Sequence, residues 1–157
     1  MSSEPDKGST FIVYLPKLLD EQSQDSGNGD NSILRGHEAI LFVDDEEDLV
    51  AMAYEMLTDL GCRVTAKTGA REALALFRLN PSRFDLLITD QTMPEMTGVE
   101  LAGEVLTPRV DMPIIICTGF SHVVDADTSS AAGVRAFAMK PLTKKEMAMT
   151  IRKVLDE

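Results

Sequence analysis

Five short apolar segments follow one another between residues 38 and 157, and polar or turn-forming residues separate them. The segments are Ala39–Val43, Arg63–Ala66, Phe84–Thr89, Pro113–Cys117 and Val134–Ala138. Within them, Leu86–Ile88 and Ile114–Ile116 are continuously apolar and do not alternate with polar residues. Continuous runs of this length are typical of strands that are buried on both faces of a parallel sheet. The pattern therefore predicts five strands of one parallel sheet.

The stretches between the predicted strands carry apolar residues at helical spacing. This spacing predicts amphipathic helices over Leu49–Leu60, Ala70–Phe77 and Met147–Leu155. The sequence Thr-x-x-Glu at Thr97 and Thr143 matches the capping box that begins a helix, and residues 121–132 form a weaker helical pattern. This alternation of strands and helices predicts an α/β fold, a (βα)5 doubly wound parallel sheet with the flavodoxin-like strand order 2-1-3-4-5.

The first part of the chain does not continue this alternation. Residues 8–16 form one β-branched and aromatic run that ends in a proline, which predicts a single strand with no partner in this chain. Residues 20–32 contain no aliphatic or aromatic side chain, a composition typical of a flexible linker. We therefore expect three parts: an appended segment over 1–19, a linker over 20–37 and one folded domain over 38–157.

Charge and cysteine content narrow the possible partners. Fifteen Lys and Arg against 26 Asp and Glu give a formal net charge of −11. Such a charge repels phosphate backbones and anionic lipids, so we expect no direct nucleic-acid binding and no membrane contact by this chain. No apolar run approaches the roughly 20 residues of a membrane helix. Cys62 and Cys117 are isolated in apolar surroundings, which favours reduced core thiols in a cytoplasmic protein.

Acidic residues gather where the first and third predicted strands end. Asp44 and Asp45 follow the first strand, and Asp90 follows the third. In the flavodoxin-like order these two strand ends are neighbours at the crevice where the strand order reverses. Carboxylates this close repel one another unless a cation lies among them, and oxygen ligands suit Mg²⁺ or Mn²⁺. The sequence thus predicts a divalent-metal site at this edge of the sheet.

Two further polar residues lie at the ends of the fourth and fifth predicted strands. These are Thr118 and Lys140. A hydroxyl, an ammonium and a metal around one carboxylate form a site suited to a phosphoryl group. Each residue alone has a simpler interpretation, because acids in a first helical turn favour the helix dipole and a Thr or Lys at a strand end is commonplace. Their joint placement at four strand ends favours phosphoryl chemistry.

At these positions the chain resembles the receiver domain of two-component response regulators. The similarity extends over residues 38–157. Supporting matches are Met93, Pro94, Gly98 and Phe137. The resemblance implies that Asp90 is the phosphoacceptor and takes a phosphoryl group from a phosphohistidine. It also implies that Asp44, Asp45 and the backbone carbonyl of Thr92 hold Mg²⁺ together with Asp90.

The same resemblance implies a conformational switch. Lys140 would pair with the phosphoryl group, while the Thr118 hydroxyl and the Phe137 ring would respond to it. The response would alter the face formed by the fourth helix and the fifth strand. The peptide bond before Pro141 is commonly cis in the family.

A second resemblance concerns the start of the chain. Residues 7–16, KGSTFIVYLP, are similar to the last strand of a histidine-kinase ATP-binding domain. Such a strand, then a polar linker, then a receiver is the order found in hybrid histidine kinases, which implies the C-terminal piece of one. We expect no ATP-dependent kinase activity from this chain itself. The implied partners are the kinase's dimerisation and phosphodonor domain, in the same protein, and a histidine phosphotransfer protein.

Two other functions share parts of this pattern. A Mg²⁺-dependent phosphatase similar to haloacid dehalogenases also uses an Asp nucleophile after a parallel strand, but it places a second Asp where Thr92 stands here. A degenerate receiver would keep the fold as a protein-binding module without the reaction. The complete set of Asp90, Thr118 and Lys140 disfavours that alternative.

Overall fold

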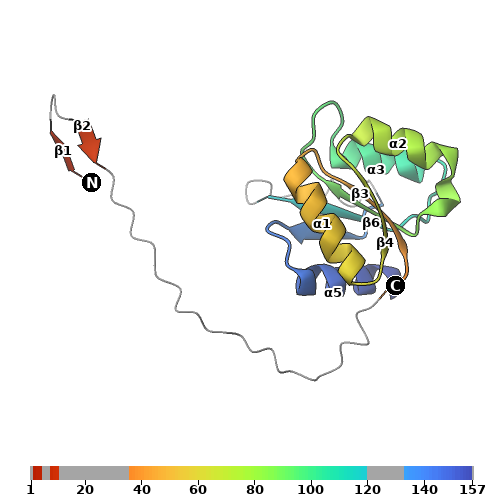
Figure 1. The fold of residues 1–157 in the computed structure, drawn as a ribbon. Helices are drawn as coiled ribbons and strands as arrows, with labels where there is room; N and C mark the ends of the chain where they lie inside the picture. The colour runs from red at the N-terminus through yellow and green to blue at the C-terminus, as the bar shows by residue number, and fades with distance from the viewer. Residues whose placement is uncertain (1, 5–7, 11–35, 120–132, 157) are drawn as a thin grey trace, which may run out of the picture.

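The computed structural model describes residues 2–4, 8–10, 36–119 and 133–156 of the chain. Five parallel strands form one sheet within it (Figure 1). They are β3 (Ala39–Val43), β4 (Arg63–Lys67), β5 (Leu86–Asp90), β6 (Ile114–Thr118) and β7 (Ala136–Met139). Their spatial order is β4-β3-β5-β6-β7. This is the order 2-1-3-4-5, and the predicted doubly wound fold is confirmed.

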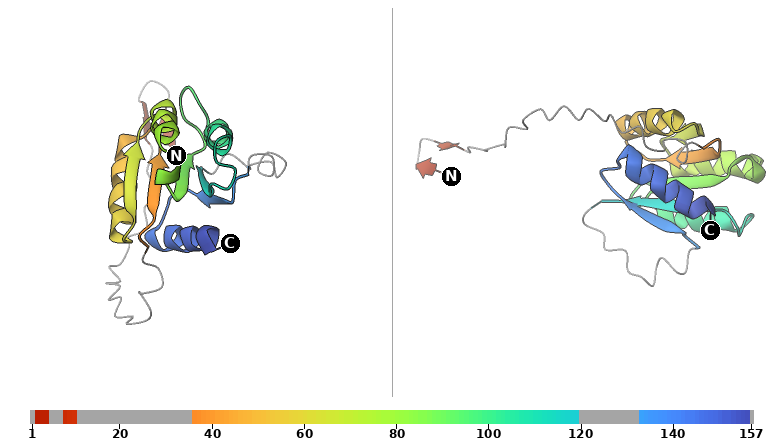
Figure 2. Two further views of the ribbon diagram at one scale, coloured as in Figure 1. Left: turned by 90° about the vertical axis from the view of Figure 1, so that its right-hand side faces the viewer. Right: turned by 90° about the horizontal axis from the view of Figure 1, so that it is seen from below.

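Two helices cover each face of the sheet among the described residues, as the views in Figures 1 and 2 show. The helices are α1 (Glu47–Asp59), α2 (Ala70–Leu79), α3 (Gly98–Leu106) and α5 (Lys144–Asp156), with a short 3₁₀ turn η1 (Pro81–Arg83). Helices α1 and α5 pack on one face, and α2 and α3 pack on the other. The weak helix predicted over residues 121–132 and the linker up to residue 35 lie outside the described residues.

The continuous apolar runs have a direct structural cause. Every residue of β3, β5 and β6 is buried. Neighbouring side chains on a strand point to opposite faces. In β3, Ile40 and Phe42 therefore pack toward α1 and α5, while Leu41 and Val43 pack toward α2 and α3. The sheet separates two apolar cores, one for each pair of helices.

Both cysteines lie inside the domain. Cys62 and Cys117 are free and buried, and both belong to the core on the α1 and α5 face. Burial raises the pKa of the Cys117 thiol to about 12. The prediction of buried, unpaired core thiols is confirmed.

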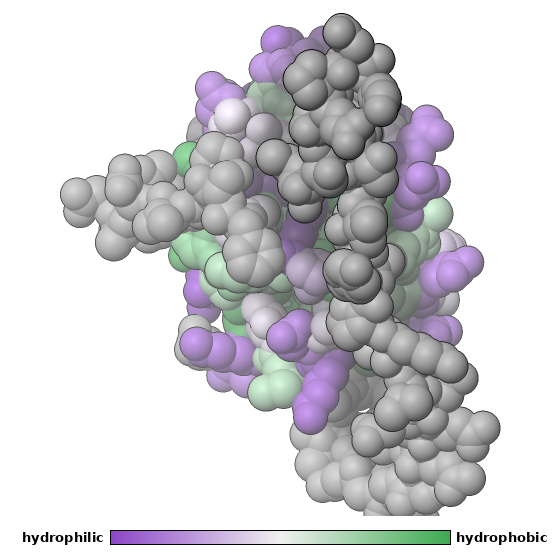
Figure 3. Space-filling model, turned by 90° about the vertical axis from the view of Figure 1, so that its left-hand side faces the viewer, coloured by the Kyte–Doolittle hydropathy of each residue, from purple (hydrophilic) through white to green (hydrophobic). Residues whose placement is uncertain are grey.

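Hydrophilic and apolar residues both reach the surface on the face shown in Figure 3. Hydrophilic residues dominate the periphery of the described surface in Figure 3, with smaller apolar areas between them. No helix among the described residues has the length and apolar character that crossing a bilayer requires.

The start of the chain differs from the prediction. Strand β2 (Gly8–Thr10) pairs in antiparallel fashion with β1 (Ser2–Glu4), so it does have a partner in this chain. The unpaired strand expected over residues 8–16 is therefore wrong for its first part, and residues 11–16 lie outside the described residues. Residues 5–7 separate the two strands in the sequence, and Pro5 and Asp6 among them are turn formers, a hairpin signal that the apolar pattern alone does not carry.

Capping residues fix the start of α3 beside the end of β5. The Thr97 hydroxyl accepts a hydrogen bond from the Glu100 N–H at 3.3 Å, and the Thr97 N–H donates to the Glu100 carboxylate at 2.8 Å. This reciprocal pair is the predicted capping box. At α5, the Thr143 hydroxyl likewise accepts from the Glu146 N–H at 3.3 Å.

Gly98 brings the first turn of α3 against the backbone of Asp90. The Gly98 N–H donates to the Gln91 carbonyl at 3.0 Å. A Cβ atom on Gly98 would lie 2.3 Å from the carbonyl oxygen of Asp90. Backbone at that distance cannot move aside as a flexible side chain could, so only glycine fits.

Replacing Gly98 with alanine is expected to lower the free energy of unfolding by about 1 to 3 kcal/mol, because the added methyl group forces the β5 end and α3 apart. Gly103 is the matched control, since it is exposed in the same helix and no atom lies within 4 Å of the position of its Cβ. Gly103→Ala should stabilise by about 0.5 to 1 kcal/mol. Urea denaturation measures both; equal effects would contradict the close approach.

Candidate functional site

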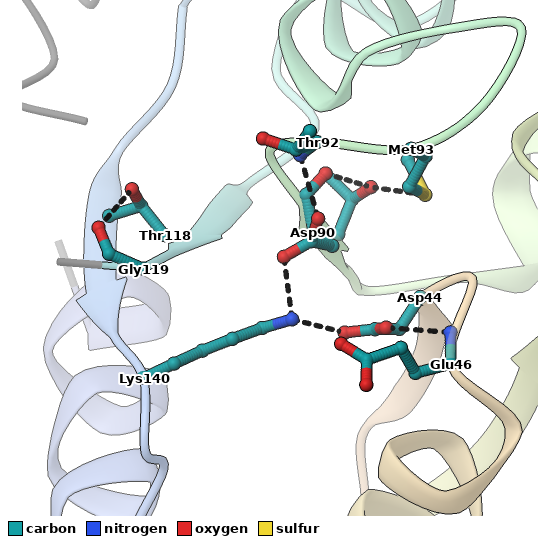
Figure 4. Close-up of polar contacts among 9 residues, drawn as sticks. Asp44, Glu46, Asp90, Thr92, Met93, Thr118, Gly119 and Lys140 are labelled. Atoms are coloured by element: carbon teal, nitrogen blue, oxygen red, sulfur yellow. Dashed lines mark hydrogen bonds and ion pairs between the residues drawn. The ribbon is translucent and has the colours of Figure 1, made fainter. Parts of the chain in front are cut away.

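Three side chains meet at the carboxyl ends of strands β3, β5 and β7 (Figure 4). Asp44 follows β3, Asp90 is the last residue of β5, and Lys140 follows β7. The Lys140 Nζ atom lies 2.8 Å from Asp44 Oδ2 and 2.7 Å from Asp90 Oδ1. The Lys140 N–H donates to the Thr118 carbonyl at 2.8 Å, which extends the β6–β7 pairing to the lysine. The parallel topology thus delivers two carboxylates and one ammonium to a single point.

Both carboxylates are almost completely removed from solvent. Asp44 is 1% exposed and Asp90 is 6% exposed. Burial alone would lower the pKa of Lys140, but hydrogen bonds and charge from Asp44 and Asp90 outweigh it and raise the pKa well above its usual value. The ammonium is therefore fully charged at neutral pH and neutralises part of the buried negative charge.

Backbone amides orient the second oxygen of each carboxylate. The Thr92 N–H donates to Asp90 Oδ2 at 2.7 Å, and the Glu46 N–H donates to Asp44 Oδ1 at 3.0 Å. Both are bonds to an amide two residues further along the chain, a pattern that Asp favours at strand ends. Each carboxylate is thus held between one backbone amide and Lys140. Sequence reasoning missed the role of Glu46, which acts through its backbone.

Asp45 is the predicted site residue that lies apart. Its side chain is exposed. Among the described residues, no group of three or more His, Cys, Asp or Glu side chains is placed to hold a metal ion. The structure therefore brings Asp44 and Asp90 together and leaves Asp45 at the rim.

The predicted switch residues lie on the neighbouring strands. Thr118 is buried at the end of β6, and its hydroxyl donates to the Gly119 carbonyl at 3.2 Å (Figure 4). Phe137 is half-buried on β7 and packs against the core on the α2 and α3 face. Pro141 follows a cis peptide bond. In this arrangement the Thr118 hydroxyl points to its own loop and not to Asp90.

The donor set suits a divalent cation. Asp44 and Asp90 offer hard carboxylate oxygens that point to one place. In this structure the Lys140 ammonium lies there and contacts both carboxylates. Mg²⁺ prefers oxygen ligands of this kind and needs only one or two carboxylates together with waters and phosphate oxygens. The residues present therefore fit Mg²⁺ in chemistry, and Asp44 and Asp90 are the carboxylates that would hold it.

Comparisons with known proteins agree with this geometry. A family model described as the response regulator receiver domain matches residues 40–152. The sensor kinase CckA of Brucella abortus is 27% identical over 99% of this chain and 17% of that protein. The Escherichia coli aerobic respiration control sensor ArcB is 29% identical over 99% of this chain and 20% of its own length. The E. coli transcriptional regulatory protein GlrR is 35% identical over 75% of this chain and 26% of its own length.

The chain thus spans about a quarter or less of these curated relatives. Solved structures give the same fold. A receiver domain protein from Clostridium thermocellum is 26% identical, with a TM-score of 0.72 over 76% of this chain and 94% of that chain. Chemotaxis protein CheY4 of Vibrio cholerae is 30% identical, with a TM-score of 0.70 over 76% of this chain and all of that chain. Neither the phosphatase nor the binding-module alternative is favoured. The chain belongs to the response regulator receiver family of two-component phosphorelay systems.

Proposed function

We propose that Asp90 accepts a phosphoryl group from a phosphohistidine of a histidine kinase. The observation that carries this assignment is the buried Asp90 carboxylate, which is oriented by the Thr92 amide and contacts the Lys140 ammonium at 2.7 Å. A carboxylate oxygen attacks the phosphorus atom, a P–O bond forms and the P–N bond breaks. The electron pair of the broken bond stays on the imidazole nitrogen, and Asp90 becomes an acyl phosphate.

Lys140 is well placed to respond to that step. In the resting arrangement it bridges Asp44 and Asp90. Once Asp90 is phosphorylated, its carboxyl group no longer carries a negative charge, and the phosphoryl oxygens carry negative charge instead. The Lys140 ammonium therefore moves its contact to a phosphoryl oxygen. Mg²⁺, held by Asp44, Asp90, the Thr92 carbonyl and the rim carboxylate Asp45, would neutralise charge on the transferring group.

The proposed switch runs through Thr118 and Phe137. Thr118 pairs with Met139 and Ile116 pairs with Phe137 across the β6–β7 ladder, so the two switch residues occupy adjacent strands. When the Thr118 hydroxyl moves toward the phosphoryl group, it leaves a space, and the half-buried Phe137 ring can turn inward into that space. The phosphoryl group would thereby bias a two-state equilibrium on the β7 side of the domain.

We further propose that the chain is the C-terminal receiver of a hybrid histidine kinase. The two sensor-kinase relatives align with 99% of this chain, including its first residues, whereas GlrR aligns with 75%. The proposed parts are a remnant of the ATP-binding domain (1–19), a linker (20–37) and the receiver (38–157). The proposed partners are the phosphodonor domain of the same protein and a histidine phosphotransfer protein. Two free thiols favour a cytoplasmic location.

Incubation with acetyl phosphate tests the phosphoacceptor assignment. Intact-mass spectrometry should show one phosphoryl adduct with Mg²⁺ and none with EDTA. Borohydride reduction followed by peptide mapping should place it on Asp90. If the chain stays unmodified while a known receiver is labelled in parallel, Asp90 is not a phosphoacceptor. An adduct on another residue would identify that residue as the phosphoacceptor instead.

A further inference from the structure

Gln91 carries an unsatisfied polar atom beside the site. Its Oε1 atom is buried and has no hydrogen-bond partner, the one such side-chain atom in the part of the chain that the structure describes. Its backbone is fully engaged: the Gln91 N–H donates to the Cys117 carbonyl at 2.8 Å, and its carbonyl accepts from the Gly98 N–H at 3.0 Å. A buried acceptor without a partner is costly, so it calls for an explanation.

The sheet register identifies the neighbour of Gln91. Asp90 pairs with Cys117 across the β5–β6 ladder, and the Gln91 N–H bond to the Cys117 carbonyl continues that ladder by one residue. The last paired residues are Asp90 and Cys117, so the backbone of Gln91, one residue beyond, lies beside that of Thr118. Neighbouring strands of a sheet lie about 5 Å apart, a distance that a glutamine side chain can span.

The Thr118 hydroxyl has a weak bond in this arrangement. It donates to the carbonyl of the very next residue, Gly119, at 3.2 Å. Good O–H···O bonds are shorter, about 2.5 to 3.0 Å. A hydroxyl has a single proton to donate. A change of the Thr118 side-chain rotamer that brings Oγ1 to the Gln91 amide would exchange a poor bond for one that also satisfies the buried amide oxygen.

We propose that Gln91 is a positioning residue whose amide oxygen accepts the Thr118 hydroxyl in a second arrangement of the unphosphorylated domain, in which that hydroxyl has left the Gly119 carbonyl. This rests on the proposed function, in which the same hydroxyl turns to the phosphoryl group on Asp90. Gln91 and the phosphoryl oxygen compete for one proton, so Gln91 opposes the active state and sets how readily the domain switches. The amide acts through Thr118 and touches neither the metal nor the phosphoryl group.

A double-mutant cycle with beryllofluoride tests this competition, using the full chain, Mg²⁺ and calorimetric titration. Gln91→Met removes the acceptor at similar volume and should tighten beryllofluoride binding about fivefold, the equivalent of one ordinary hydrogen bond. In a Thr118→Val background, the same replacement should have no effect. An equal change in both backgrounds, or none in either, would overturn the proposal.

Nuclear magnetic resonance separates this proposal from the phosphoacceptor assignment. In the Mg²⁺-free, unphosphorylated chain, Gln91→Met should shift the Thr118 methyl resonance and its side-chain rotamer populations. Thr118→Val keeps Gln91 intact and should shift the side-chain amide resonances of Gln91. Unchanged resonances in both variants would refute the hydrogen bond. Failure of the wild-type chain to bind beryllofluoride, with the resonance shifts present, would refute the proposed function instead.

Discussion

Replacing Asp90 with asparagine is expected to abolish the phosphoryl adduct and leave the fold in place. An amide oxygen is not a nucleophile toward phosphorus under these conditions, so the reaction loses its acceptor. The asparagine oxygen can still accept the Thr92 N–H, and Lys140 keeps its contact with Asp44 at 2.8 Å. The free energy of unfolding should therefore change by no more than about 1 kcal/mol.

The matched control is Asp111→Asn, which removes one carboxylate of the same type from an exposed loop where it only faces Arg109 at 3.7 Å. It should be labelled at the wild-type rate. Intact mass after acetyl phosphate, with circular dichroism and urea denaturation on the same samples, separates lost chemistry from lost structure. Persistent labelling of Asp90→Asn would show that the phosphoryl group goes elsewhere.

The sheet could be predicted from the sequence because burial on both faces leaves an unambiguous apolar pattern. Strand limits were less accurate. The apolar pattern places Phe84 in the third strand, but the strand begins at Leu86, because η1 precedes it and Phe84 stacks on Phe77 with ring centroids 6.3 Å apart. A large aromatic residue beside a strand looks the same in the sequence whether it extends the sheet or packs beside it.

The site could be predicted in composition and only partly in geometry. The positions of the strand ends in the sequence predict that Asp44, Asp90 and Lys140 lie close together, and in the structure they are in contact. The sequence treats Asp44 and Asp45 alike, yet adjacent side chains point in different directions, so one is buried and the other exposed. Nor does a sequence specify hydroxyl rotamers or unsatisfied acceptors, so the Gln91 oxygen becomes visible only in three dimensions.

Lys140→Met should impair both phosphorylation and stability. On the proposed function the ammonium would neutralise the transferring group, so its loss should slow labelling by acetyl phosphate about 100-fold. It also leaves two buried carboxylates facing each other. Breaking a buried ion pair costs about 3 to 5 kcal/mol when both partners are enclosed; since Lys140 is 22% exposed, we expect about 2 kcal/mol.

The pH dependence of this stability difference follows from the raised pKa of Lys140. A lysine whose pKa is higher in the folded state stabilises fully at any pH below its unfolded value, about 10.4. The contribution is lost only as pH rises through the higher folded value. The difference in unfolding free energy between wild type and Lys140→Met should therefore stay constant from about pH 7 to pH 10 and shrink above it.

Mg²⁺ should act more strongly on the Lys140→Met variant than on the wild type. In the wild type a divalent cation at the proposed site would share Asp44 and Asp90 with the ammonium. In the variant it would be the sole neutralising charge, so its binding should gain more free energy and stabilise the folded state more. Lys144→Met is the control, because Lys144 pairs with Asp59 at 3.1 Å on an exposed surface and should change stability by less than about 1 kcal/mol. Thermal unfolding with and without Mg²⁺ measures both variants. If Mg²⁺ raised the melting temperature of all three proteins equally, Lys140 would not be sharing the carboxylates with the metal.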